Sequence, residues 1–162
     1  MADAPPEVPA EIEDYLIGLS ARAGQLGGQI GGRVAGSITG VRGTAAAASR
    51  GGARGGASGA ARLRTKVEER TGHVRGTAQE VADRLEEAFP RAQPLPASQG
   101  VRLAVPVGMT GLQQIVLDAE LSASGDASVH VRLRGFGKEG LISRKPTRTV
   151  TDQAWAALLA DG

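Results

Sequence analysis

The 162-residue chain has no cysteine, only two histidines and few aromatic residues. Without cysteine it can form neither a disulfide framework nor a thiolate metal site. The histidines, His73 and His130, lie far apart in the sequence, so the composition predicts no metal centre. Aromatic residues make up 2% of the chain and many apolar residues are alanine, which predicts thin hydrophobic cores.

The sequence also lacks any run of about 20 apolar residues, the length that a membrane-spanning helix needs. Its first residues have neither the basic nor the apolar segment of a secretory signal peptide. We therefore expect a soluble protein that does not span a membrane. Arginine outnumbers lysine 16 to 3 beside abundant alanine and glycine, which favours a bacterial source. The expected location is the cytoplasm, either free or peripheral to a membrane or a larger assembly.

Charge is segregated along the chain, although the net charge is only +2. Residues 1–19 carry five acidic and no basic side chains, whereas residues 20–75 carry ten basic and two acidic ones. A basic stretch of this kind can bind an anionic surface such as nucleic acid or a membrane. It can equally meet the protein's own acidic segments within an assembly.

Glycine recurs at every fourth position in the early part of the chain. The main row is Gly24, Gly28, Gly32, Gly36 and Gly40, and a second row of small residues beside it includes Gly27, Gly31 and Gly43. Residues four apart share one face of an α-helix, so these rows predict a groove into which another backbone can pack. The predicted partner is a second copy of the chain or another helical protein.

This segment resembles the glycine-zipper stretches of some bacterial envelope proteins. It differs from them in carrying Gln25, Gln29, Arg33 and Arg42, so the resemblance does not imply membrane spanning. Each interior glycine costs a helix about 1 kcal/mol relative to alanine, so this helix cannot form alone. Residues 24–48 are therefore either a helix that depends on tight packing or a disordered linker. Aliphatic residues at a fixed offset from the glycines favour the helix.

Periodicity divides the N-terminal part of the chain into a tail and a helical region. Residues 1–8 are acidic and proline-rich, which predicts a flexible tail. We expect a helical region over 9–90, with helices at about 10–48 and 60–89 and a break between Ser49 and Gly59. The simplest arrangement is an antiparallel hairpin that packs residues 10–50 against 60–89. The fold class is thus α+β: this glycine-zipper hairpin and a small antiparallel module after it.

Residues 91–100 form a proline-rich linker before that module, which covers residues 101–162. Alternating apolar residues predict strands near 101–107, 115–121 and 129–133. If Ala123 faces Ala127 across a three-residue loop, then Leu121 pairs with Val129, Glu120 with His130 and Asp118 with Arg132. A loop around Gly135-Phe136-Gly137, a short strand near Leu141 and a helix capped by Thr151 and Asp152 complete the module.

Candidate chemistry is sparse. His130 beside Asp118 or Glu120 is an acid–base pair or, as the alternative, part of cross-strand ion pairing on a solvated face. The glycines around Lys138 do not fit a phosphate-binding loop, because such a loop has Ser or Thr after its lysine. We therefore predict no enzyme activity, cofactor, metal or small-molecule substrate.

Two hypotheses about function remain. The first is a non-enzymatic structural or scaffolding protein that self-assembles, or packs on a partner, through the glycine groove and presents the C-terminal module for recognition. The second is a binder of an anionic surface through the basic segment 20–75, where residues 50–56 resemble the RGG segments of RNA-binding proteins. The candidate contacts for an anionic partner are Arg33, Arg42, Arg50, Arg54, Arg132, Arg134 and Lys138.

Overall fold

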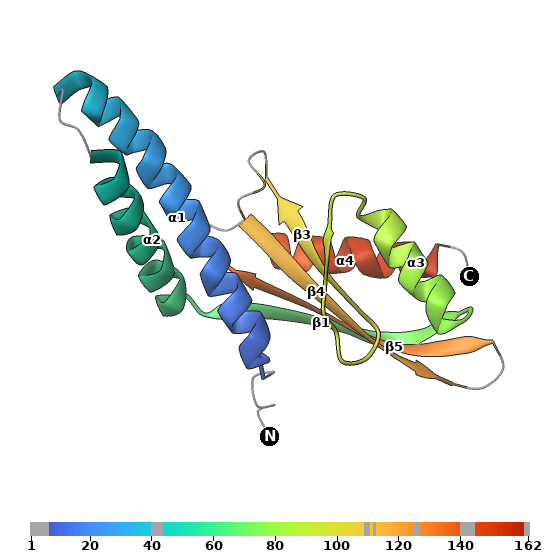
Figure 1. The fold of residues 1–162 in the computed structure, drawn as a ribbon. Coiled ribbons are helices and arrows are strands. Elements are labelled where there is room, and N and C mark those ends of the chain that lie inside the picture. The colour runs from blue at the N-terminus through green and yellow to red at the C-terminus, as the bar shows by residue number, and fades with distance from the viewer. Residues whose placement is uncertain are drawn as a thin grey trace. The chain divides into compact units, whose positions relative to one another are not determined.

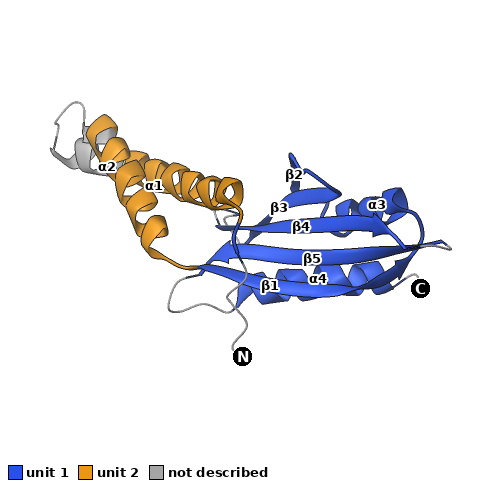
Figure 2. Ribbon diagram, turned by 90° about the horizontal axis from the view of Figure 1, so that it is seen from below, with its two compact units in different colours: residues 1–8, 65–162 blue, residues 9–64 orange. Residues whose placement is uncertain are grey.

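The computed structural model describes residues 7–39, 44–108, 111, 113–124, 127–139 and 145–160, with the backbone alone for 31–39 and 44–45. The chain divides into two compact units, coloured separately in Figure 2. Residues 9–64 form the helical unit, and residues 1–8 with 65–162 form the sheet unit. Most of the predicted tail, 1–8, lies outside the described residues.

The helical unit is a pair of helices, α1 (Ala10–Thr39) and α2 (Thr44–Arg62), which lie side by side in Figure 1. The helices are antiparallel, because Gly24 contacts Gly52 while Gly28 contacts the earlier residue Ala48. The prediction of a helix in the first glycine repeat is confirmed over Ala10–Thr39. The predicted single helix 10–48 is wrong, because residues from Thr44 onward belong to the antiparallel helix α2. The predicted break between Ser49 and Gly59 is wrong, since α2 runs through that segment. The glycines of α2 have low helix propensity, but the small residues at fixed spacing allow α2 to pack closely against α1, and this packing offsets the cost.

The prediction of one helix over 60–89 is wrong. Residues Thr65–Arg75 form strand β1, and only Ala78–Ala88 form a helix, α3. Gly76, with a φ of 113°, separates the two elements. Thr77 then caps α3: its side chain accepts from the Glu80 N–H, while its own N–H donates to the Glu80 carboxylate at 2.7 Å. The hairpin of 10–50 against 60–89 is therefore wrong as well, because α1 packs against α2.

The sheet unit contains a five-stranded antiparallel sheet in the order β1-β5-β4-β3-β2. Its other strands are β2 (Gln93–Leu95), β3 (Val101–Val107), β4 (Gln113–Ala123) and β5 (Ser128–Lys138). The predicted strands near 101–107, 115–121 and 129–133 are confirmed. The predicted linker 91–100 contains the short strand β2. The predicted start of the C-terminal module at residue 101 is wrong, because its continuous part begins at Thr65, where β1 pairs with β5 along its whole length.

The predicted register of the β4–β5 hairpin is wrong by two residues. Leu121 pairs with Val131, Glu120 with Arg132 and Asp118 with Arg134. The turn lies one residue later than expected, because Ala127 takes a φ of 53° and the Ser124 N–H donates to the Ser128 carbonyl at 3.0 Å. Each residue's partner moves by two positions, so the apolar and polar faces of the strands are preserved.

Helices α3 and α4 (Pro146–Leu159) cover one face of the sheet, as Figure 1 shows. The buried core between them includes Val81, Leu85, Leu117, Val131, Leu133, Ala154 and Leu158. Burial of these aliphatic side chains is the main source of stability in the sheet unit. Alternation along β4 and β5 directs the apolar set to this face.

The C-terminal helix α4 begins earlier than predicted. It begins at Pro146, a residue suited to the first helical position, so Thr151 and Asp152 lie inside the helix and do not cap it. The predicted loop around Gly135-Phe136-Gly137 is wrong too, because these residues belong to β5. A β-carbon at Gly135 would overlap the Thr151 hydroxyl, so glycine is needed there for close approach of α4 to the sheet. The predicted strand near Leu141 lies outside the described residues.

Candidate functional site

The main glycine row of α1 packs against α2 of the same chain. A β-carbon added at Gly24 would overlap the Gly52 carbonyl, and one added at Gly28 would overlap the Ala48 carbonyl. The reverse holds for α2, where a β-carbon at Gly56 would overlap the Ser20 carbonyl. The backbones of α1 and α2 are therefore in close contact, which is possible because glycine has no side chain. Within the described residues, this part of the predicted groove is filled.

Sequence reasoning missed the α2 side of this contact. Ala48, Gly52 and Gly56 have the same four-residue spacing as the α1 row, and that spacing was the available signal. The sequence between Ser49 and Gly59 predicts a break because it contains no aliphatic residue. Close contact between backbones needs small residues only, so aliphatic residues are not required.

Small residues beside this contact are open on both helices, Gly27 in α1 and the row Gly51, Gly55 and Gly59 in α2. A β-carbon placed at Gly27, Gly51, Gly55 or Gly59 meets no atom within 4 Å, and all four residues are exposed. Leu26 and Ile30 of α1 are also exposed, by 49% and 66% respectively. The helical unit thus keeps a row of small residues and two large aliphatic side chains that the rest of the described chain does not cover.

Gly31, Gly32 and Gly36, with Arg33, lie in the part of α1 where the structure describes backbone alone. Gly40, Gly43 and Arg42 lie outside the described residues.

The predicted anionic-partner contacts on α2 are exposed. The helix contains three arginines and no acidic residue. Arg50 donates from Nε to the Ala46 carbonyl at 3.3 Å, and its guanidinium remains exposed together with that of Arg54. Within the described part of the chain, neither Arg50 nor Arg54 forms an ion pair. This face of α2 therefore carries uncompensated positive charge.

The two predicted arginine contacts on the sheet, Arg132 and Arg134, are neutralised by acidic side chains of the sheet itself. Arg132 binds Glu69 through two hydrogen bonds of 3.1 Å, which raise the pKa of the Arg132 guanidinium. Arg134 binds Asp118 at 2.8 Å and also pairs with Glu120. The alternative of cross-strand ion pairing is thus the one observed. Lys138 lies at the end of β5.

Asp118 is the centre of this network. Its carboxylate accepts from Arg102 Nε at 2.9 Å on one side and from Arg134 on the other. The side chains of Asp118 and Arg102 are 3% and 8% exposed. A buried carboxylate needs such partners, because an uncompensated charge in this position would be costly. The network is structural, because Arg102 and Arg134 engage both oxygens of the Asp118 carboxylate.

His130 has different neighbours from those predicted. On β4 it pairs with Ser122 rather than with Glu120, and on β1 it pairs with His73. The two imidazole rings lie edge to face with centroids 5.2 Å apart. The predicted acid–base pair with Asp118 or Glu120 is therefore wrong, because the register places an arginine opposite each acid.

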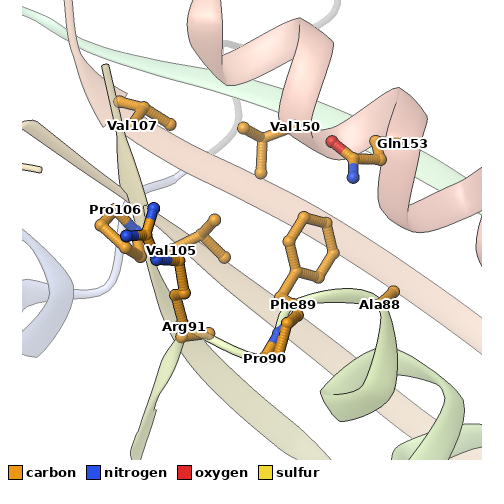
Figure 3. Close-up of a pocket in the computed structure, with 10 residues that line it drawn as sticks. Ala88, Phe89, Pro90, Arg91, Val105, Pro106, Val107, Val150 and Gln153 are labelled. Atoms are coloured by element: carbon orange, nitrogen blue, oxygen red, sulfur yellow. The ribbon is translucent and has the colours of Figure 1, made fainter. Parts of the chain in front are cut away.

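The sheet unit has a pocket at the end of α3 (Figure 3). Its volume is about 250 Å³, at the small end for sites that bind small molecules. Figure 3 shows the Phe89 ring directed toward Val150 and Gln153 of α4. The lining is mostly apolar and comprises Ala88, Phe89, Pro90, Arg91, Ala92, Val105, Pro106, Val107, Val150 and Gln153. No arrangement of a nucleophile with a base is present among these residues.

Comparisons with known proteins identify no family. No protein-family model matches the chain, and no curated protein matches it. The chain is similar to a solved structure of norcoclaurine synthase from Thalictrum flavum, at 15% identity and a TM-score of 0.25, over 59% of this chain and 87% of that one. A likeness at this TM-score bears on neither the fold nor the function. Among the described helices, none combines the length and hydropathy needed to cross a membrane.

Proposed function

We propose that the protein is a non-enzymatic scaffolding protein that self-associates through its helical unit and presents the sheet unit for recognition. The observation that carries the proposal is the open row Gly51, Gly55 and Gly59 on α2. A closed row of the same kind already packs α1 against α2, so this surface chemistry demonstrably supports close helix contact in this chain. The expected occupant of the open row is a helix from a second copy.

Burial of Leu26 and Ile30 would add to such a contact. An exposed leucine or isoleucine gains about 1.5–3 kcal/mol when it is fully buried. Helix contact through small residues gains dispersion and Cα–H···O interactions at short distance. These contributions together offset the loss of translational and rotational freedom on association.

Light scattering coupled to size-exclusion chromatography of the full chain tests self-association. The wild type should be an oligomer, whereas Gly55→Leu with Gly59→Leu should be a monomer with the same helix content. Both glycines have open space in the single chain, so the substitutions leave the α1–α2 contact intact. Ala61→Leu, at an exposed position on another face of α2, is the matched control and should keep the oligomer. A monomeric wild type, or an oligomer unaffected by the double substitution, contradicts the proposal.

A second candidate function is binding to an anionic surface through α2. Its support is the exposed set Arg50, Arg54 and Arg62 on a helix without acidic residues. Binding to DNA or RNA should weaken steeply with salt, because each phosphate contact releases counterions. Fluorescence anisotropy with duplex DNA, and sedimentation with anionic vesicles, separate the two surfaces. Arg50→Gln with Arg54→Gln should reduce binding while Arg91→Gln should not, and no association at about 50 mM salt excludes this function.

A further inference from the structure

His73 and His130 face each other on adjacent strands. They are direct partners in the β1–β5 ladder, which extends over all 11 residues of each strand. Their rings have centroids 5.2 Å apart and planes at 66°. Direct cross-strand partners lie on the same face of a sheet, so the ladder holds the two imidazoles as neighbours. The sequence does not predict this proximity, because the two histidines lie far apart in it. The sheet thus brings together the only two histidines of the chain.

Both imidazoles are available for ligand binding. The His73 side chain is exposed and that of His130 is half-buried. Across the residues that the structure describes, no hydrogen bond or ion pair engages either ring. A neutral imidazole in this state has one ring nitrogen with a free lone pair. The pair therefore offers two nitrogen donors from one rigid ladder.

We propose that His73 and His130 form a two-histidine chelate for a divalent transition-metal ion of the Cu²⁺, Ni²⁺ or Zn²⁺ class. Imidazole nitrogen is a preferred ligand of these ions. A zinc–nitrogen bond is about 2.0–2.1 Å long, so two nitrogens in one tetrahedral shell lie roughly 3.3 Å apart. From the present centroid separation of 5.2 Å, the proposed chelate requires the two side chains to rotate until one nitrogen of each ring reaches that distance.

The site is open to solvent on its remaining positions. The described residues contain no group of three or more potential metal-ligating side chains, so water completes the coordination shell. Such a site binds a metal ion exchangeably rather than as a structural centre. This inference is independent of the proposed scaffolding function.

Neighbouring charges set the strength of binding. Arg132 follows His130 by two residues on β5 and lies on the same face, but its charge is compensated by Glu69 and Glu120. Arg75 lies two residues beyond His73 on that face and is exposed. Its positive charge opposes a divalent cation, so Arg75→Gln should tighten metal binding.

Titration of the tag-free full chain with Cu²⁺, followed by NMR of the imidazole signals, tests the site. Paramagnetic Cu²⁺ should broaden the signals of both histidines and saturate at one ion per chain. His73→Gln or His130→Gln should each abolish saturable binding, and Thr71→Ala, on the same strand face, should retain it. Binding that survives either histidine substitution, or absence of broadening in the wild type, overturns the proposal.

Thermal unfolding provides a second readout. A metal ion that bridges β1 and β5 binds the folded state only, so excess Ni²⁺ should raise the Tm of the wild type and leave both histidine variants unchanged. Arg75→Gln keeps both histidines and should give a larger rise in Tm than the wild type. An equal shift in the histidine variants would show that Ni²⁺ binds elsewhere.

Discussion

Gly24 and Gly52 face each other across the α1–α2 contact, and a β-carbon on either residue would overlap the main-chain carbonyl oxygen of the other. Helices with this composition are poor in intrinsic propensity, since each interior glycine costs about 1 kcal/mol relative to alanine. Their stability therefore depends on the close contact, and the contact depends on the glycines. Substitutions within α2 can separate these two effects.

Gly52→Ala and Gly55→Ala form a matched pair three residues apart in α2. Gly52→Ala should destabilise the helical unit by about 2 kcal/mol, because overlap with the α1 backbone outweighs the gain in helix propensity. Gly55→Ala should stabilise it by about 0.5–1 kcal/mol, because the new methyl group meets open space. Urea unfolding of the full chain, followed by helical circular dichroism, measures both changes. Equal effects of the two substitutions would show that α2 does not pack closely through Gly52.

Asp118→Asn should destabilise the sheet unit by about 3 kcal/mol. The substitution keeps the side-chain volume but leaves Arg102 and Arg134 without their shared carboxylate in a buried position. Glu120→Gln is the control, since that side chain is 40% exposed and the loss should stay below about 1 kcal/mol. Thermal and urea unfolding of the purified variants give the comparison. A loss for Asp118→Asn no larger than for Glu120→Gln would show that the network contributes little.

Gly135→Ala should destabilise the packing of α4 on the sheet by about 1–3 kcal/mol. The added methyl group would overlap the hydroxyl of the buried Thr151. Thr151→Ala should restore part of the loss in the double variant, because it removes the overlapping atom. Unfolding of the two single variants and the double variant gives the interaction energy. Strict additivity would contradict the proposed contact.

The capping box of α3 predicts a pH dependence. The Thr77 backbone N–H, and then the Thr77 hydroxyl, lower the pKa of the Glu80 carboxyl below its ordinary value of 4.5. A lowered folded-state pKa means that the stabilisation is complete above the unfolded-state pKa and is lost as the pH falls through the folded-state value. NMR titration should place the Glu80 midpoint below that of an unstructured peptide. Thr77→Ala removes the hydroxyl but keeps the backbone N–H, so it should return the midpoint only part of the way toward the peptide value. An unchanged midpoint would contradict the contribution of the hydroxyl.

Strand β1 explains most of what the sequence failed to reveal. Val67 and Val74 are seven residues apart, which puts them on one face of a helix but on opposite faces of a strand. This spacing predicts a helix, but residues Thr65–Arg75 form a strand because they pair with β5. That pairing joins residues about 60 positions apart, so no local window contains it. Only the tertiary structure explains the glycine at position 72, because a β-carbon there would lie 3.1 Å from the Trp155 ring.

The sequence by itself determined the elements whose signal is local: the helical first glycine repeat, the alternation of β3, β4 and β5, and the α+β class. These follow from backbone preference and from the period of apolar residues. Only the tertiary structure decided which surfaces meet. It placed α2 in the glycine groove, arginines opposite Asp118 and Glu120, and His73 beside His130. Each of these contacts joins residues distant in the chain, and the packing of whole elements, rather than any local propensity, selects them.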